Sequence, residues 1–283
     1  MHCGNVEVGC LHSSPALKTD EGRGTMDRGM CFDEWQEKGK VMNRTTRIVD
    51  LAYLKWPRLV QGILIRRYQR FKADVKLRNG HVVTAHCPNS GSMLECSEPG
   101  RPVYLSRHSN PKRQFKYTWE MIKMPSSLVG VNTMVPNRLT EASISARNIR
   151  ALSGFDQIRS EVRYGENSRI DLLLTKGEAR CFVEVKNCTL VSDGVAYFPD
   201  AVTSRGLKHL VELQQQVRLG NRSVMFFLVQ RMDAKLFRPA DHIDPAYGRE
   251  LRQAVQNGVE VMVYDVKIDL EGIRLNQHLP YEI

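Results

Sequence analysis

Two carboxylates and a lysine within residues 168–188 have types and a spacing suited to phosphodiester chemistry. This stretch reads SRIDLLLTKGEARCFVEVKNC, in which two apolar runs flank a turn-prone Lys-Gly-Glu at 176–178. The pattern predicts an antiparallel hairpin. A two-residue loop at its tip places Asp171 directly opposite Glu184. Lys186 shares their face, because successive side chains of a strand alternate between the two faces of the sheet.

Folding alone does not explain this placement, since like charges directly opposite each other destabilise a hairpin. A divalent cation reverses the sign of the interaction. Carboxylates are hard oxygen ligands suited to Mg²⁺ or Mn²⁺, so Asp171 and Glu184 are candidate metal ligands. Lys186 could orient, or help to deprotonate, a water that attacks a phosphodiester. The alternative is an ordinary solvated strand face, on which an acid followed two residues later by Lys is common.

The elements before the hairpin predict a small β-barrel. Five short strands are expected within fewer than 70 residues, which suits an OB-type barrel, a scaffold that binds oligonucleotides on one face. An SH3-like barrel has a similar pattern. The expected strands are Leu59 to Tyr68, Phe71 to Leu77, His81 to Ala85, Val103 to Ser106 and Lys116 to Lys123.

Positive charge is concentrated in this part of the chain. The net charge is +10, and residues 42–124 hold 16 Lys or Arg against 5 Asp or Glu, a net of +11. Such an excess favours a polyanionic partner, either nucleic acid or an anionic membrane surface. Here basic and aromatic residues alternate, so that Arg or Lys could contact phosphates while an aromatic ring stacks on a nucleobase. Burial habits favour core or edge packing over stacking for Tyr68 and Phe71. The candidates are Arg66, Arg67, Tyr68, Arg70, Lys72, Lys112, Arg113 and Lys116.

Beyond residue 125 the pattern mixes helices and strands in the order αβββαβαβ. The hairpin supplies the second and third strands, and the second helix, 204–219, is clearly amphipathic. The run VMFFLV at 224–229 is continuously apolar, as in a central strand covered on both faces. The remaining elements are expected at 138–152, 157–163, 246–257 and, for the last strand, 259–266.

This order resembles the core of the PD-(D/E)xK phosphodiesterase superfamily. The resemblance implies that Asp171 and the Glu184-Val185-Lys186 run carry a Mg²⁺ or Mn²⁺ site with nuclease activity. Ile170 stands where the superfamily pattern has Pro. A further acid from the first helix often joins such a site, and Glu141 is the first candidate, with Glu161 the second. In the second helix, Arg205, Lys208 and His209 are expected to face the phosphate backbone.

A closer resemblance covers roughly residues 56–268. The motifs GILIRRYQRFKADV, VTAHCPNSGSM, YGENSRIDLLL, FVEVKNCTLV and FPDAVTSRGLKHLVEL look like the bacterial sugar fermentation stimulation protein A (SfsA) family. This resemblance implies an OB-like N-terminal domain, a PD-(D/E)xK-type C-terminal domain, DNA binding and a link to sugar (maltose) catabolism. Two interpretations follow: a Mg²⁺-dependent nuclease acting on DNA or RNA, or a non-catalytic DNA-binding regulator that uses a nuclease-like fold.

The cysteines, the apolar runs and the N-terminal composition predict where the protein is located in the cell and how the chain divides into domains. Seven cysteines form no C-x-x-C pair, which favours a reducing cytoplasm. The chain lacks an apolar run near the roughly 18 residues of a membrane span, so we expect no membrane partner. Residues 1–41 are expected to be disordered or non-native, with a natural start near Met42. The expected divisions are 1–55 as an extension, 56–124 as the OB-like domain and 125–283 as the nuclease-like domain.

Overall fold

The computed structural model of this chain describes residues 52–165 and 168–283. The expectations for residues 1–41, including a start near Met42, lie outside the described residues. The described residues all belong to one compact unit. Its architecture is mixed α and β, and it contains a barrel, a seven-stranded sheet and a small three-stranded sheet.

The N-terminal part of this unit is a closed five-stranded barrel, as the strand spacing predicts. The strand order is β4-β3-β2-β5-β6, and a parallel bridge between His86 and Thr118 pairs β4 with β6 and closes the barrel. A short strand, β7 (Leu128–Gly130), continues beyond β6. Buried side chains such as Leu64, Leu105 and Trp119 fill the interior. The barrel strands are β2 (Leu59–Tyr68), β3 (Lys72–Leu77), β4 (Val82–His86), β5 (Pro102–Arg107) and β6 (Tyr117–Lys123).

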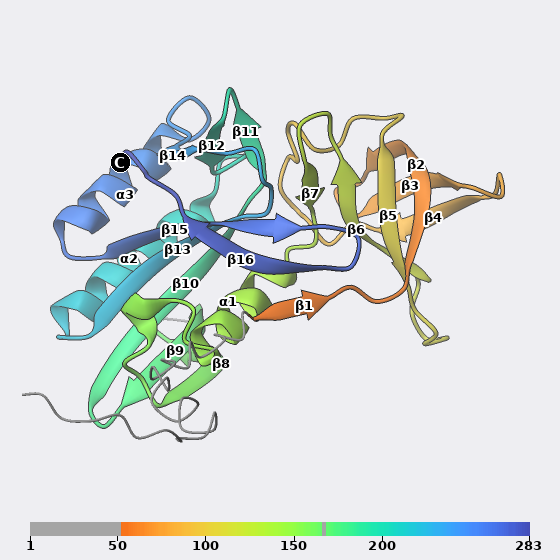
Figure 1. Ribbon diagram of the computed structural model, residues 1–283. Helices are drawn as coiled ribbons and strands as arrows, with labels where there is room; N and C mark the ends of the chain where they lie inside the picture. Colours follow the sequence, from red (N-terminus) through yellow and green to blue (C-terminus); the bar gives the residue numbers. More distant parts are fainter. Residues whose placement is uncertain (1–51, 166–167) are drawn as a thin grey trace, which may run out of the picture. The chain divides into compact units, whose positions relative to one another are not determined.

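The larger sheet has the strand order β1-β16-β15-β13-β10-β9-β8, in which the hairpin strands β10 and β9 lie between the central strand β13 and the edge strand β8 (Figure 1). Strands β8, β9 and β10 form an antiparallel meander, whereas β10, β13 and β15 run parallel to one another. The expected order αβββαβαβ is present. Its members are α1 (Val135–Ser145), β8 (Gln157–Tyr164), β9 (Ser168–Lys176), β10 (Ala179–Cys188), α2 (Ser204–Arg218), β13 (Arg222–Val229), α3 (Pro245–Gln256) and β15 (Glu260–Ile268).

Several elements depart from the sequence-based prediction. The first helix ends at Ser145, and residues 150–152 form a separate 3₁₀ turn. Strand β16 (Gly272–His278) follows the strand expected to be last. Strand β1 (Tyr53–Lys55), within the stretch assigned to the extension, pairs with β16 at the sheet edge. A separate small sheet contains β11 (Leu190–Ser192), β12 (Val195–Phe198) and β14 (Leu236–Pro239).

Helices cover both faces of the larger sheet, which explains the apolar run of β13. Helices α2 and α3 lie against one face, where Leu210 and Leu251 pack with Phe227 (Figure 1). Helix α1 lies against the other face, where Leu139 packs with Phe226. Alternate residues of β13 therefore enter two different cores, and the strand has no solvated face. None of the helices in the described part of the chain is long and apolar enough to cross a membrane.

A glycine substitution in the barrel tests the close packing of β2 against β3. A Cβ added at Gly62 would lie 2.4 Å from Val75 Cγ1 and 2.9 Å from the Lys76 carbonyl oxygen. We expect Gly62→Ala to lower the free energy of unfolding by about 1–3 kcal/mol, because the backbone must shift to admit the methyl group. Urea unfolding measures this change. Gly154→Ala is the control, because nothing lies within 4 Å of its added Cβ. Equal stability of the two variants would contradict the packing described.

Candidate metal and nucleic-acid site

The hairpin has the register predicted from its sequence. Strands β9 and β10 pair from Lys176↔Ala179 to Leu172↔Val183, and the next step places Asp171 opposite Glu184. The backbone N–H of Val185 donates to Asp171 Oδ2 at 2.8 Å. The two carboxylates are therefore cross-strand neighbours at the end of the hairpin ladder.

Glu184 is almost completely buried, at 2% exposure, and its two carboxylate oxygens have different environments. Oε1 accepts a hydrogen bond from Lys186 Nζ at 2.7 Å and also bonds His209 Nδ1. Burial alone would raise the pKa of Glu184, but the Lys186 charge and the bond from His209 outweigh it and lower the pKa. The other oxygen, Oε2, is buried and has no hydrogen-bond partner among the described residues.

Asp171 has the opposite electrostatic character. Burial, followed by the nearby Glu184 charge, raises its pKa to about 6. The Val185 N–H, the Lys186 charge and a 2.8 Å hydrogen bond from Asn137 Nδ2 to Oδ1 oppose this increase without cancelling it. One carboxylate of the pair is therefore held ionised, while the other binds a proton readily in the absence of a cation.

The donor set fits a hard divalent cation bound by two carboxylates. The buried, unpartnered Glu184 Oε2 is a desolvated anionic oxygen, and such an oxygen is costly unless a cation or a donor satisfies it. Magnesium is usually bound by one or two carboxylates, with waters and substrate phosphates completing its shell. Across the described ranges, residues 52–165 and 168–283, no group of three or more His, Cys, Asp or Glu side chains could hold a metal ion.

The expected additional acid does not join the pair. In the described part of the chain Glu141 does not form a three-acid metal-binding group with Asp171 and Glu184, and the α1 side chain that hydrogen-bonds Asp171 is Asn137, one helical turn earlier. Glu161 lies in β8 with an exposed side chain and a positive φ of 55°. The structure thus brings together Asp171, Glu184 and Lys186, and leaves both further acids apart from them.

These residues lie in a cleft of about 680 Å³ that has walls from both the barrel and the larger sheet. Arg67, Arg70 and loop 89–92 belong to the barrel side, whereas Asp171, Glu184, Lys186 and Arg205 belong to the sheet and to α2. The barrel and the carboxylate pair therefore share one cavity, as a nucleic-acid site with a metal centre requires.

Arg67 builds one wall of the cleft. Its guanidinium donates to three loop carbonyl oxygens, those of Asn89 at 3.0 Å, Gly91 at 2.7 Å and Ser92 at 3.1 Å. These bonds use both hydrogens of Nη2 and one of Nη1, so Arg67 supports the loop while still lining the cleft, and its contact with phosphate stays a prediction. On the other side of the loop, Asp200 Oδ2 accepts from Met93 N at 2.9 Å. A Cβ at Gly91 would lie 2.6 Å from the Asp200 carboxylate, so this position requires glycine.

The other expected nucleic-acid contacts are divided among several surfaces. Arg66 donates to Asp74 at 2.8 Å and its guanidinium lies over the Tyr68 ring. Lys72 Nζ lies 5.9 Å from the centre of the same ring. Arg66, Tyr68 and Lys72 lie outside the cleft. Arg113 lines a second cavity and Lys116 a third, and Lys112 lies in the same loop. Among the described residues, the cleft itself is lined by Arg67, Arg70, Lys186 and Arg205, of which Arg70 and Arg205 form no ion pair with a carboxylate.

His209 is a site residue whose role the sequence did not reveal. It was expected on the phosphate-facing surface of the second helix, but it is buried, and its ring bonds Glu184 and lies 3.2 Å from Lys186 Nζ. Arg205 Nε donates to the other ring nitrogen at 3.4 Å. Lys208, one position earlier, forms a 3.7 Å ion pair with Glu212. The i, i+4 spacing of Arg205 and His209 is the one sequence signal that could have linked them.

Comparison with known proteins identifies the family. A model described as the sugar fermentation stimulation protein RE domain matches residues 134–272, and the SfsA N-terminal OB domain matches residues 65–131. This chain belongs to the SfsA family. A sugar fermentation stimulation protein homolog of Geotalea daltonii is 55% identical over 224 residues, which are 79% of this chain and 97% of that relative. The homolog of Geobacter sulfurreducens is 57% identical over 222 residues, covering 78% of this chain and 95% of the relative.

A solved structure has the same fold. The structure of Pyrococcus furiosus SfsA in complex with Ca²⁺ aligns with a TM-score of 0.76 at 26% identity, covering 81% of this chain and 98% of that chain. The fold and the family expected from the sequence motifs are thereby confirmed.

The two carboxylates should affect stability with opposite signs. The pKa of Asp171, about 6, lies above the roughly 3.9 of an unfolded Asp, so between these values the folded state binds more protons. Stability therefore falls as pH rises from about 4 to 6. We expect Asp171→Asn to raise the free energy of unfolding by about 1–3 kcal/mol at pH 7.5, with the difference vanishing near pH 4.

Glu184→Gln is the matched comparison. The pKa of Glu184 is lowered in the folded state, so its contribution is present at neutral pH and is lost as pH falls through that value. Removing the charge leaves Lys186, which is 13% exposed, without its partner. We expect a loss of about 3–5 kcal/mol at pH 7.5. Urea unfolding in metal-free buffer measures both variants, and destabilisation by Asp171→Asn at neutral pH would contradict the electrostatics of the pair.

Proposed function

We propose that this SfsA-family protein is a DNA-binding nuclease that depends on Mg²⁺ or Mn²⁺. The observation that carries the proposal is the buried, unpartnered Glu184 Oε2 beside Asp171, on the floor of a cleft that the barrel also lines. Carboxylate oxygens in this arrangement suit a hard cation and an anionic substrate together.

A cation held by Asp171 and Glu184 would act as a Lewis acid on a phosphodiester oxygen. The chain's own groups supply the rest. Lys186 is held by Glu184 Oε1 at 2.7 Å, so its ammonium group is fixed at the cleft floor, where it can orient a water or a phosphate oxygen. His209 fixes the same carboxylate from α2, and Asn137 fixes Asp171 from α1. Each acid is thus oriented before substrate arrives.

Two arginines support binding of the DNA backbone. Arg70 and Arg205 line the cleft from its barrel side and its α2 side, and neither has a carboxylate partner in the described part of the chain. Guanidinium groups pair well with phosphate oxygens, so the two can hold a backbone across the carboxylate pair. The relative from Pyrococcus furiosus, titled as a Ca²⁺ complex, supports a hard-cation site in this family.

A second candidate function is DNA binding without catalysis, as in a regulator of sugar (maltose) catabolism. One feature favours it: Glu184 Oε1 is engaged by both Lys186 and His209, and no third carboxylate joins the pair in the described residues. A site with these bonds can bind a nucleic acid through Arg70 and Arg205 without cleaving it. The names of the relatives agree equally with this role.

A cleavage assay separates the two candidates. Purified protein is incubated with labelled single- and double-stranded DNA and RNA, with Mg²⁺ or Mn²⁺. We expect Asp171→Ala and Lys186→Ala to lower the cleavage rate by about 10²-fold or more, because each removes a group that acts on the reacting phosphate. Lys176→Ala is the control, since this exposed lysine lies at the far end of the same hairpin. Cleavage that survives Asp171→Ala excludes this site, and DNA binding by an inactive wild-type protein favours the regulator.

The salt dependence of binding tests the electrostatic part. We expect the logarithm of the binding constant to fall linearly with the logarithm of salt concentration, with a slope of roughly −0.9 per phosphate neutralised on duplex DNA or roughly −0.7 on single strands. Arg70→Gln and Arg205→Gln should each make the slope shallower by about one such contact. Fluorescence anisotropy with a labelled oligonucleotide measures the slope, and a flat response would rule out backbone binding.

A further inference from the structure

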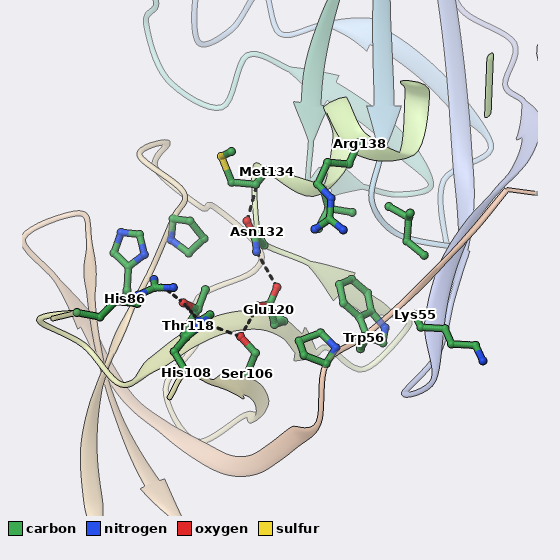
Figure 2. A pocket seen from close by; sticks show the side chains of 15 residues that line it. Lys55, Trp56, His86, Ser106, His108, Thr118, Glu120, Asn132, Met134 and Arg138 are labelled. Carbon is green, nitrogen blue, oxygen red and sulfur yellow. Dashed lines mark hydrogen bonds between the residues drawn. The ribbon is translucent and has the colours of Figure 1, made fainter. Parts of the chain in front are cut away.

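A second, smaller cavity of about 280 Å³ lies where the barrel meets α1. Polar side chains of β5 and β6 form one side, and residues from the segment after β1 and from α1 form the other (Figure 2). Neither the carboxylate pair nor Lys186 lines it. It is separate from the cleft, although the adjacent α1 residues Asn137 and Arg138 line the cleft and this cavity respectively.

The polar side of this cavity is an ordered hydrogen-bond network. Glu120 is buried at 5% exposure, and its two oxygens accept from Ser106 Oγ at 2.6 Å and from Asn132 Nδ2 at 2.7 Å. His108 Nε2 lies 2.9 Å from Thr118 Oγ1 and 3.4 Å from Ser106 Oγ (Figure 2). The Glu120 carboxylate is therefore satisfied internally. It holds hydroxyl and imidazole groups in place and has no free oxygen for a cation.

His108 can present one more hydrogen-bonding group to a ligand. Burial, followed by the nearby Arg113 charge, lowers the pKa of His108, so the ring is neutral at physiological pH. A neutral imidazole carries one donor and one acceptor nitrogen, and only Nε2 is engaged within the described residues. Its Nδ1 remains available to a ligand. The Ser106 hydroxyl donates its proton to Glu120 and can therefore only accept from a ligand, while the Thr118 hydroxyl accepts from Arg113 Nη2.

The opposite side of the cavity has a fixed aromatic plane. The backbone N–H of Trp56 donates to the Glu271 carbonyl at 2.9 Å, and its indole Nε1 donates to the Asp269 carbonyl, also at 2.9 Å. Both the position and the tilt of the ring are thus set by the β15–β16 turn. Trp56 and His86 lie toward opposite ends of the cavity (Figure 2). A pre-oriented ring of this kind is suited to stacking on a flat heterocycle.

Lys55, Arg113 and Arg138 are the Lys and Arg side chains that line the cavity, and the two arginines complete the polar lining. Arg113 Nη2 donates to Thr118 Oγ1 at 3.3 Å, and Arg138 extends from α1 toward the cavity (Figure 2). Within the described ranges neither forms an ion pair with a carboxylate, and the one acid that lines the cavity is the internally satisfied Glu120. The rim therefore favours an anion, and guanidinium groups bind phosphate in particular.

We propose that this cavity is a nucleotide-binding pocket, which stacks one base on Trp56, reads its edge through His108, Ser106 and Thr118, and holds its phosphate with Arg113 and Arg138. Its volume lies just below the roughly 300–1,000 Å³ of small-molecule sites, which suits a single nucleotide. The nucleotide in the pocket could come from two sources: an unstacked nucleotide of a bound strand, or a free mononucleotide. The first source rests on the proposed function, because it requires a strand bound in the adjacent cleft.

A hydrogen-bond chain connects the pocket with the cleft. Gln230 Nε2 donates to the Asn132 carbonyl at 3.2 Å and to Asn187 Oδ1 at 2.7 Å. Asn132 holds Glu120 in the pocket, whereas Asn187 lines the cleft next to Lys186. The two cavities thus share structural support.

Calorimetry on the full-length chain without metal tests the pocket directly. The probes are AMP, GMP, CMP and dTMP, with inorganic phosphate as the simple anion, and the same protein is then titrated with a single-stranded oligonucleotide. We expect Arg138→Gln to weaken mononucleotide binding about tenfold, as the loss of a charge-assisted bond requires. Trp56→Leu should weaken it about tenfold through lost stacking, while Trp56→Phe retains most of the affinity. Arg249→Gln, an exposed arginine of α3 outside both cavities, should change nothing.

The Asp171→Ala variant allows the proposal of a nucleotide-binding pocket to be tested separately from the proposal of a nuclease site. This variant removes the proposed metal site but should leave mononucleotide affinity within about twofold, because the pocket does not contain Asp171. Loss of oligonucleotide affinity in Trp56→Leu and Arg138→Gln indicates the strand as the source; loss of mononucleotide affinity alone indicates a free nucleotide. Phosphate binding as tight as AMP, or pocket variants indistinguishable from Arg249→Gln with every probe, would overturn the proposal whether or not the protein cleaves DNA.

Discussion

The structure depends on one unfavourable juxtaposition, that of Asp171 and Glu184 across a buried hairpin. Two anions in this position cost folding energy, and the surrounding groups reduce the cost unequally. Lys186 and His209 lower the pKa of Glu184 against the effect of burial. Burial and the Glu184 charge raise the pKa of Asp171, and the groups around it do not cancel this increase. A divalent cation bound between the two carboxylates would reduce both their mutual repulsion and the cost of burying them. Strain retained in this manner is characteristic of functional sites.

The cleft around the pair depends on contacts between segments distant in the sequence. Arg67 of the barrel orders loop 89–92, and this loop reaches Asp200 of the larger sheet domain through a backbone N–H and through Ser92. The barrel is therefore more than a basic surface, because one of its strands shapes the wall opposite Lys186. The basic residues of the barrel therefore do not all serve to bind an anionic partner. Several of them form contacts that support the fold, and a smaller number face the cleft.

Periodicity predicts the local features well. The turn chemistry at 176–178 gives the hairpin register that places Asp171 opposite Glu184, and the apolar run of β13 indicates a strand covered on both faces. The five barrel strands follow from alternation and the turn at Asn79-Gly80, where Gly80 has a φ of 85°. These predictions succeed because each depends on residues only a few positions apart.

The features missed by sequence reasoning depend on long-range contacts. In α2, Val211 is 45% exposed, while the polar His209 is buried against Glu184. Hydrophobic periodicity does not include a polar contact of this kind, which accompanies the apolar packing of Leu210 and Leu213. Similarly, β1 has three residues and gains its partner from β16 at the far end of the chain. Asn137, which lies in α1 before the residue at which the pattern predicts the helix to begin, hydrogen-bonds Asp171.

We propose that Asp171 and Glu184 Oε2 hold one hard divalent cation. Anomalous scattering from a crystal of the wild-type protein grown with Mn²⁺ tests this proposal. We expect an anomalous peak at about 2.0–2.6 Å from an Asp171 carboxylate oxygen and from Glu184 Oε2, with no peak in crystals of Asp171→Asn grown in the same way. A peak bound elsewhere, or a wild-type carboxylate pair that still hydrogen-bonds only to protein at saturating Mn²⁺, would contradict it.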